Sequence, residues 1–313
     1  MKTTLVSIII VNYNGLNFLE KCINSIKKSF LYHNYEIIIV DNASLDGSCE
    51  WLRQRNDIIY IESNTNLGFT GGNNLGAARA SGNRLLFINN DTEIITPLDE
   101  LISIIDDSSV GIVGCRLQYG DLRQQFSFGY EHTPLRIVLS WLGLEKNHKL
   151  PRVFRRLETN PVNYLKNQNN LDWVSGACFA IRTEVWKKVN GFDTGFFMYC
   201  EDVDLCLRVR KIGLDILYAA NCCVIHFEGA GKSWIGELAL KRTVQSYQLF
   251  LSKHFNKRSA IASSLALALI FLLRSFVFFV QSKSKKDKDE IKIKKSIGFF
   301  NAAKFLLGSI NKI

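Results

Sequence analysis

The densest group of reactive side chains is an acidic cluster two thirds of the way along the chain. Glu201, Asp202 and Asp204 fall within four residues, between the apolar runs 196–199 and 205–207. A run of acids is usually a solvated surface. Apolar flanks instead indicate partial burial, which raises the pKa of a carboxyl group and suits a general base. The cluster is therefore a candidate for the group that removes a proton from a substrate.

Arg208 follows the acids at helical spacing with Leu205 and Ile212. The acids then open a helix, where negative charge is favourable. Arg208 would lie one or two turns along that helix, able to meet a phosphate group.

Two more acids lie just after apolar runs. Asp41 ends the run 36–40, and Asp91 follows the run 84–88 and two asparagines. A carboxylate at the first position can accept the imide N–H of uracil or thymine, or simply cap a turn. A carboxylate at the second can hold Mg²⁺ or Mn²⁺ bridging two phosphates.

His226 follows the last apolar run, 215–225, and is a candidate second metal ligand. Imidazole suits Mn²⁺ better than Mg²⁺. The alternative is an ordinary surface or core histidine.

A glycine-rich segment, 64–74, is expected to be a turn that opens a helix. Glycine permits close approach of a ligand, and a helix start offers free N–H groups to an anion. The segment fits neither the Walker nor the GxGxxG pattern, so a structural turn remains an equal alternative.

Alternating strands and helices are expected to position these residues. Strands are predicted at 5–11, 36–40, 58–61, 84–88, 112–115 and 215–225, and helices at 16–29, 46–55, 73–81 and 183–189. This alternation predicts a mostly parallel, doubly wound sheet, whose ligands bind beyond the carboxyl ends of the strands. Asp41, Asp91 and His226 all fall at such ends.

The charge distribution separates a tail from the rest of the chain. Residues 232–313 carry 16 Lys and Arg against 4 Asp and Glu, a balance of +12, whereas residues 1–231 carry −2. A basic nucleic-acid-binding core is therefore not expected. The eight cysteines show no CxxC pair or zinc spacing, which predicts reduced, mostly buried thiols.

The tail contains helix-forming segments at 237–256, 259–281 and 296–310. The second is apolar and long enough to cross a bilayer, although it contains Arg274 and has basic flanks on both sides. We expect 259–281 and 296–310 to attach the protein to a membrane, more readily as interfacial helices than as one crossing. A soluble packed helix is the remaining alternative.

Taken in order, seven segments resemble glycosyltransferase family 2, the inverting enzymes with a GT-A fold, and most closely its bacterial rhamnosyltransferase subgroup. The resemblance spans about residues 5–228, through segments 7–14, 40–44, 66–74, 89–91, 173–178, 191–193 and 196–208. It implies a catalytic domain at 1–231, with a donor half (1–115), a variable acceptor loop (116–171) and a catalytic part (172–231). Residues 232–313 are the basic helical tail.

The resemblance also implies roles for individual residues. Asp91 would be the metal-binding acid of a DxD-like element in which Asn89 replaces the first Asp, with His226 as its partner. Asp202 would be the catalytic base, with Asp204 as the second choice. Glu201 would position the acceptor, and Asp204 and Arg208 would support the site. Donor contacts would come from Asn14, Asp41, Gly68, Asn73 and Arg208, and acceptor contacts from Trp173 and Gly176.

The implied reaction moves a sugar from a nucleoside-diphosphate donor to a saccharide, assisted by Mn²⁺ or Mg²⁺. L-Rhamnose from dTDP-rhamnose is the first expectation, and UDP-linked hexose or N-acetylhexosamine is the alternative. The acceptor is expected to be carried on a polyprenyl diphosphate at the cytoplasmic face of the membrane, for polysaccharide synthesis. An inactive nucleotide-sugar-binding protein or a membrane scaffold are the rivals from other classes.

Overall fold

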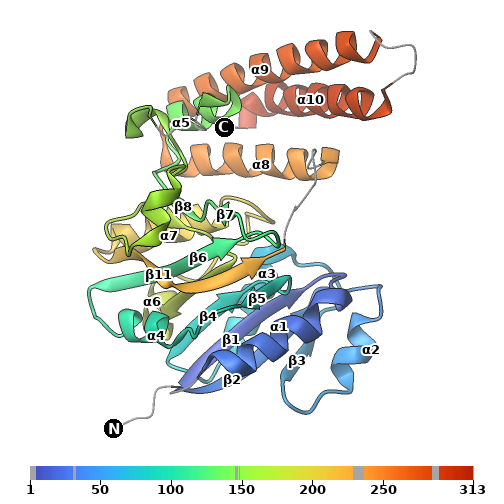
Figure 1. Cartoon of the computed structure of the whole chain (residues 1–313). Coiled ribbons are helices and arrows are strands. Elements are labelled where there is room, and N and C mark those ends of the chain that lie inside the picture. Colours follow the sequence, from blue (N-terminus) through green and yellow to red (C-terminus); the bar gives the residue numbers. More distant parts are fainter. Residues whose placement is uncertain are drawn as a thin grey trace. The chain divides into compact units, whose positions relative to one another are not determined.

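The central strands are apolar because helices cover both faces of the sheet. The computed structural model describes residues 5–30, 33–144, 147, 149–227, 236–283 and 289–312. In it β1 (Leu5–Asn12), β2 (Asn34–Asp41) and β4 (Arg84–Ile88) are runs of mostly buried Ile, Leu, Val and Phe side chains, and β3 (Ile59–Glu62) lies beside β2 (Figure 1).

The sheet order is β3-β2-β1-β4-β10-β6-β11-β5, with β7 (Gln124–Gln125) paired to β6. The remaining strands of this sheet are β5 (Thr92–Ile94), β6 (Val110–Gln118), β10 (Cys178–Arg182) and β11 (Asp215–His226). β1 pairs in parallel with β2 and β4, and β11 with β6, whereas β10 runs antiparallel to both β4 and β6. The predicted mostly parallel sheet is confirmed, but the antiparallel β10 at its centre was not predicted.

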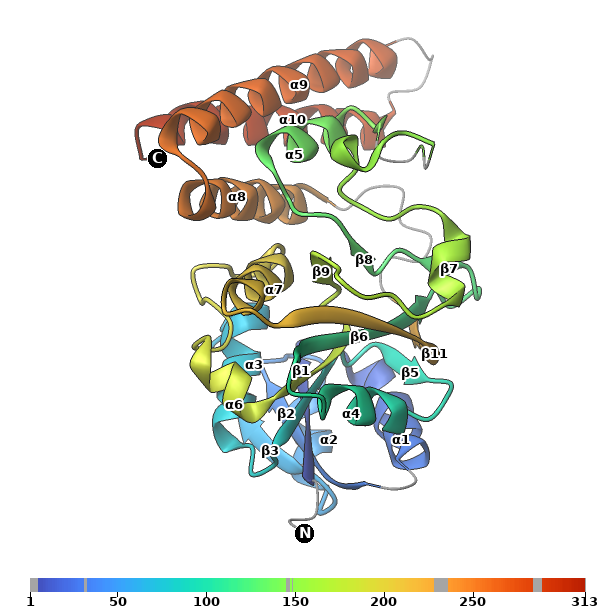
Figure 2. The same ribbon diagram turned by 90° about the vertical axis from the view of Figure 1, so that its left-hand side faces the viewer.

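Helices α1 (Leu16–Ser29) and α4 (Asp99–Ile105) share one buried cluster with Val6, Ile8 and Ile10 of β1. α3 (Gly68–Arg79) packs on the opposite face, where Gly76 lies against Ile9. α6 (Thr183–Lys188) lies near α3 (Figure 2). It joins that face through the contact of Trp186 with Phe87 of β4. The remaining helices of this part are α2 (Ser48–Arg53), α7 (Glu201–Lys211) and a 3-10 helix at Pro161–Leu165.

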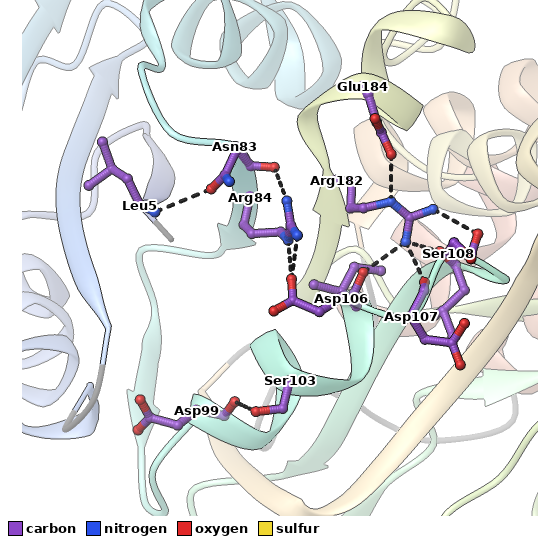
Figure 3. Close-up of polar contacts among 12 residues, drawn as sticks. Leu5, Asn83, Arg84, Asp99, Ser103, Asp106, Asp107, Ser108, Arg182 and Glu184 are labelled. Carbon is purple, nitrogen blue, oxygen red and sulfur yellow. Dashed lines mark hydrogen bonds and ion pairs between the residues drawn. The ribbon is translucent and has the colours of Figure 1, made fainter. Parts of the chain in front are cut away.

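Arg182 closes the turn between α4 and β6, at the sheet edge opposite the strand ends discussed below. Its guanidinium donates to the carbonyl oxygens of Ile105, Asp107, Val110 and Ser108, at 2.6–3.1 Å (Figure 3). Only 5% of Arg182 is exposed. Buried carbonyl groups left without a donor cost more than the net gain of a hydrogen bond, so this side chain stabilises the turn strongly.

Replacing Arg182 by Ala is expected to lower the free energy of unfolding by about 3 kcal/mol or more, because several buried carbonyls lose a charged donor. The matched control is Arg123→Ala, whose side chain is 74% exposed and pairs with Asp121. The control should change stability by less than about 0.5 kcal/mol. Urea unfolding measures both, and equal losses would contradict this role of Arg182.

Several predicted elements need correction. The helix expected at 73–81 begins at Gly68, so that most of the glycine-rich segment is helical rather than a preceding turn. The stretch 116–171, expected to be irregular, contains α5 (Pro134–Trp141), a 3-10 helix at Arg152–Phe154 and β8 (Phe128–Gly129). β8 pairs with β9 (Trp173–Val174) in a small second sheet. These strands are too short for periodicity to reveal.

The chain divides into two compact units. Unit 1 comprises residues 1–131, 157–197 and 201–230, and unit 2 comprises 132–156, 198–200 and 231–313. The boundary predicted at 231/232 lies outside the described residues.

Unit 2 is helical. Besides α5 it contains α8 (Gly236–His254), α9 (Lys257–Lys283), α10 (Glu290–Ser309) and a final 3-10 helix, Ile310–Lys312. These match the three predicted tail helices in place and type. Lysines 285, 286 and 288 of the predicted basic flank lie outside the described residues.

α9 and α10 pack on each other through serine and phenylalanine side chains and expose other large apolar residues. Phe299 of α10 contacts the rings of Phe271 and Phe278 of α9. Ser275 and Ser296 donate to each other's carbonyl oxygens at 2.8 and 2.9 Å. Eight large apolar residues of α9 face outward: Leu265, Leu269, Leu272, Leu273, Phe276, Val277, Phe279 and Val280. A large exposed apolar surface of this kind is typical of a protein or membrane interaction site.

Within the described residues, α9 is one helix that is long and apolar enough to cross a membrane, with 28% of its most apolar stretch buried. Arg274 donates to the Trp141 carbonyl at 2.5 Å and lies over the rings of Trp141 and Phe299. Its charge is thus held against aromatic faces within unit 2, where it is attracted to the ring electrons.

All eight cysteines are free and buried, as predicted. Burial raises the pKa of the Cys22 and Cys206 thiols to about 12. Thiols that stay protonated at neutral pH are poor nucleophiles and poor metal ligands, so their role is packing.

Candidate active site

One edge of the sheet collects most of the predicted polar residues. β1, β2, β4, β6 and β11 all end at this edge, where Asp41 ends β2 and His226 ends β11. Because β10 is antiparallel, its first residue, Cys178, pairs with the last residue of β4, Ile88. The antiparallel strand therefore brings the loop 175–177 to the same edge as 89–91.

Asp91 and His226 face each other there. Asp91 Oδ1 lies 3.3 Å from His226 Nε2, and Asn89 Nδ2 lies 3.1 Å from the same ring nitrogen. His226 Nδ1 lies 3.1 Å from Gln125 Oε1, and the histidine is only 3% exposed. The two residues were predicted as partners from the strand ends alone, and the structure brings them together.

This donor pair fits a divalent cation. Metal bonds of about 2.0–2.2 Å to one oxygen and one nitrogen place two ligand atoms roughly 3 Å apart, as found here. If Nδ1 donates to Gln125, Nε2 carries a lone pair, which the Asn89 amide meets here and which a cation would take in its place. A hydrogen bond from the other ring nitrogen is the usual outer-shell arrangement for a ligating histidine. The described residues contain no group of three or more His, Cys, Asp and Glu side chains that could hold a metal. Phosphate oxygens and water commonly complete such sites.

Asp202 lies at the start of α7 and contacts the loop before β10. Its Oδ2 accepts a hydrogen bond from the Gly176 N–H at 3.1 Å, and its side chain is half-buried. The neighbouring Ala177 carbonyl accepts from the Asn89 N–H at 2.9 Å. A continuous chain of contacts thus joins Asp202 to the Asp91–His226 pair.

Asp204 is held differently. It is 1% exposed, and its Oδ2 accepts from Arg208 Nε at 2.7 Å. Arg208 also donates to the carbonyls of Val189 and Gly191. These contacts hold the turn after α6 against α7 and engage the guanidinium within the protein. A phosphate contact of Arg208 stays a prediction, and Asp202 is the more accessible of the two acids.

Asp41 has no exposed surface. Its carboxylate accepts from Asn12 Nδ2 and from the Ser44 N–H, both at 2.8 Å. Asn90 Nδ2 donates to Asn12 Oδ1 at 2.7 Å. This network fixes the ends of β1, β2 and β4 against one another, and Asp41 also orders the turn that follows it.

Asn14 links two loops at this edge. Its Oδ1 accepts from the Leu45 N–H, and its own N–H donates to Ser44 Oγ, both at 2.8 Å. The side chain of Asn14 is exposed, as a donor-contacting residue requires.

The glycine-rich segment docks against residues 196–197. The Phe69 N–H donates to the Phe197 carbonyl at 2.9 Å, and Thr70 Oγ1 donates to the Phe196 carbonyl at 2.6 Å. Asn73 is 2% exposed and donates to the Phe69 carbonyl. These contacts give segment 64–74 a structural role, which was the alternative to a ligand contact. Asn73 contributes to this role.

Gly68 has a φ of +73°, and a Cβ there would lie 2.5 Å from the Phe197 carbonyl oxygen. Gly68→Ala is expected to destabilise the protein by more than the roughly 1–2 kcal/mol of the left-handed backbone alone and to raise the donor KM. Gly143→Ala is the matched control, since its φ is +78° but nothing lies within 4 Å. If urea unfolding shows equal losses, the Phe197 contact contributes nothing.

The remaining predicted residues are buried. Glu201 is 7% exposed and Trp173 is 6% exposed. Trp173 Nε1 donates to the Tyr130 carbonyl at 3.1 Å, which favours a scaffold role over stacking on a sugar. Sequence reasoning missed Gln125, Asn12 and Asn90, because amides carry no charge signal and their partners are remote in sequence.

Comparison with known proteins gives a consistent result. The sequence model of Glycosyl transferase family 2 matches residues 7–189, more than half of the chain. The rhamnosyltransferase WbbL of Escherichia coli K12 is 26% identical over 71% of this chain and 83% of its own length. The O-antigen biosynthesis protein RfbC of Myxococcus xanthus is 29% identical over 74% of this chain, which spans only 18% of that longer protein.

A shorter match is the N-acetylglucosaminyl-diphospho-decaprenol L-rhamnosyltransferase of Mycobacterium tuberculosis H37Rv, 31% identical over 35% of this chain and 38% of that protein. Among solved structures, Staphylococcus aureus TarS 1–349 with UDP-GlcNAc has a TM-score of 0.54 at 17% identity, covering 97% of this chain and 81% of that one. GalNAc-T7 with UDP, GalNAc and Mn²⁺ has a TM-score of 0.57 at 16% identity, covering 99% and 57%. These structures share the fold, and the chain belongs to glycosyltransferase family 2.

Proposed function

We propose that this chain is an inverting glycosyltransferase that moves L-rhamnose from a dTDP-linked donor to a saccharide carried on a polyprenyl diphosphate. Two of its relatives are named rhamnosyltransferases, and one of these acts on a decaprenol-linked acceptor by its name. The observation that carries the proposal is the chain of contacts from Asp202 through the 176–177 loop to Asp91 and His226.

Asp202 acts as the general base. Its carboxylate accepts the proton of an acceptor hydroxyl while that oxygen attacks the anomeric carbon of the donor. The new C–O bond forms as the bond to the nucleoside diphosphate breaks on the opposite face, which inverts the anomeric configuration. The Gly176 N–H donates to Oδ2 and orients the carboxylate. Asp204 is held by Arg208, which supports the choice of Asp202 over Asp204.

Asp91 and His226 would hold a Mn²⁺ or Mg²⁺ ion, which supplies charge stabilisation to the leaving diphosphate when bound. Gln125 orients the His226 ring. Asn14, whose side chain is exposed, contacts the donor nucleotide in this proposal. Asp41 was expected to contact the pyrimidine base, but it has no exposed surface, and its bonds to Asn12 and Ser44 instead shape the surrounding loops.

The tail attaches the enzyme to the cytoplasmic membrane face, where a lipid-linked acceptor is found. The outward apolar residues of α9 and the +12 charge of residues 232–313 support this placement. Each Lys or Arg near an anionic surface contributes about 1 kcal/mol to binding. The basic flanks on both sides of α9 favour helices lying in the interface over a single crossing.

A donor screen tests the proposed function. Purified protein with Mn²⁺ should hydrolyse or transfer from dTDP-L-rhamnose faster than from UDP-glucose, UDP-galactose or UDP-N-acetylglucosamine. A UDP-sugar used faster than dTDP-L-rhamnose would overturn the donor assignment and leave the enzyme class intact. Turnover of none of the four would favour a nucleotide-sugar-binding protein without catalysis.

A further inference from the structure

A groove of about 450 Å³ runs between α8 and α10 in unit 2. Its floor is formed by small and apolar residues of α10, among them Gly298, Ala302, Phe305 and Gly308. Its rim carries Lys241 from α8 and Lys304 from α10. The volume is that of a site for a small organic group.

The two lysines are the distinctive feature of this groove. Neither forms a hydrogen bond or ion pair with another of the described residues. The one carboxylate in the lining, Glu237, accepts a hydrogen bond from Asn301 Nδ2 at 2.6 Å instead. The groove therefore has a net charge of +1 and two ammonium groups available to an anion.

The groove adjoins the apolar surface of α10. Phe300 lies four residues before Lys304 and Leu307 lies three residues after it, so all three share one side of the helix. Phe300 is 52% exposed and Leu307 is 46% exposed. Exposed apolar side chains flanking a lysine are typical of a helix at the level of lipid headgroups.

We propose that the groove between α8 and α10 binds the headgroup of an anionic phospholipid in the bilayer. Lys241 and Lys304 contact the phosphate, Asn301 hydrogen-bonds to polar atoms of the headgroup, and Phe300 and Leu307 enter the apolar layer beside it. The charge of the rim complements the phosphate, and the apolar floor excludes a fully hydrated anion. This inference rests on the proposed membrane attachment and adds a specific lipid contact to it.

Vesicle flotation with the full chain tests the proposal. The probes are vesicles of phosphatidylcholine alone and vesicles with phosphatidylglycerol added. The wild type should bind the second at least about tenfold more tightly, since two lysines each contribute about fivefold near an anionic surface. Lys241→Ala with Lys304→Ala should remove most of this preference.

Two further variants distinguish binding in the groove from general attraction of the basic tail to an anionic surface. Lys257→Ala with Lys294→Ala removes the same charge from exposed lysines of α9 and α10 that do not line the groove, and should keep most of the preference. Gly308→Leu keeps every lysine and fills the groove, and nothing lies within 4 Å of its new Cβ. This variant should lose the preference, with circular dichroism unchanged.

The proposal is overturned if the control variant (Lys257→Ala with Lys294→Ala) loses as much of the phosphatidylglycerol preference as the groove variant (Lys241→Ala with Lys304→Ala). It is also overturned if Gly308→Leu keeps the wild-type preference. It is also overturned if phosphatidylcholine vesicles with a polyprenyl phosphate are preferred and those with phosphatidylglycerol are not, which would assign the groove to the acceptor lipid. If the wild type binds none of these vesicles, the proposed membrane attachment itself is contradicted. Transfer to a water-soluble acceptor would still test the enzymatic function separately.

Discussion

Replacing Asp202 by Asn is expected to lower the rate of sugar transfer by about 10²–10⁴-fold, the usual cost of losing a positioned general base. Asparagine has nearly the same shape and can still accept the hydrogen bond from the Gly176 N–H, so donor binding should not change. Initial rates with saturating donor, together with calorimetric titration of the donor, measure the two effects separately.

Asp215→Asn is the matched control, because Asp215 is exposed at the start of β11, at the opposite edge of the sheet. It should keep wild-type activity. Asp204→Asn is expected to lower stability as well as activity, since it removes the buried charged partner of Arg208. If Asp202→Asn keeps more than about a tenth of wild-type activity, Asp202 is not the base.

The second large effect concerns the cation. Chelation should stop transfer and Mn²⁺ should restore it, because Asp91 and His226 are placed as ligands. Gln125→Ala removes an outer-shell contact and should weaken Mn²⁺ binding by about 10–100-fold, as is usual for such contacts. His226→Ala should weaken it further.

Binding of Mn²⁺ in the presence of a nucleoside diphosphate, followed by electron paramagnetic resonance, ranks these variants without relying on activity. Asp215→Asn again serves as the control, since Asp215 is exposed at the opposite edge of the sheet. Full transfer activity in excess EDTA would exclude the metal, and wild-type affinity in His226→Ala would exclude His226 as a ligand.

The sequence predicted the parallel part of the sheet because long apolar runs between helices leave few other arrangements. It also predicted that Asp91 and His226 would meet, although they are 135 residues apart. Both residues follow strands, and parallel strands end at one edge. β10 was not predicted because Cys178–Arg182 leads directly into α6, with no turn residues to mark its end.

The less predictable part of the site depends on which partner each side chain contacts, and not on the order of the strands. Arg208 has the spacing to meet a phosphate, yet it lies one helical turn from Asp204 and pairs with it. Trp173 is an aromatic residue of the kind that stacks on sugars, but it is buried and donates a hydrogen bond to the Tyr130 carbonyl. Such choices are decided by neighbours remote in the sequence, which periodicity and spacing do not reveal.

The anomeric configuration of the product tests the central claim most directly. Full-length enzyme, Mn²⁺, dTDP-β-L-rhamnose and a saccharide on a short polyprenyl diphosphate should give one added deoxyhexose. Its one-bond carbon–proton coupling in the nuclear magnetic resonance spectrum should identify an α linkage, because a single displacement with Asp202 as base inverts the anomeric carbon. A β-linked rhamnose would contradict single displacement and, with it, the role assigned to Asp202.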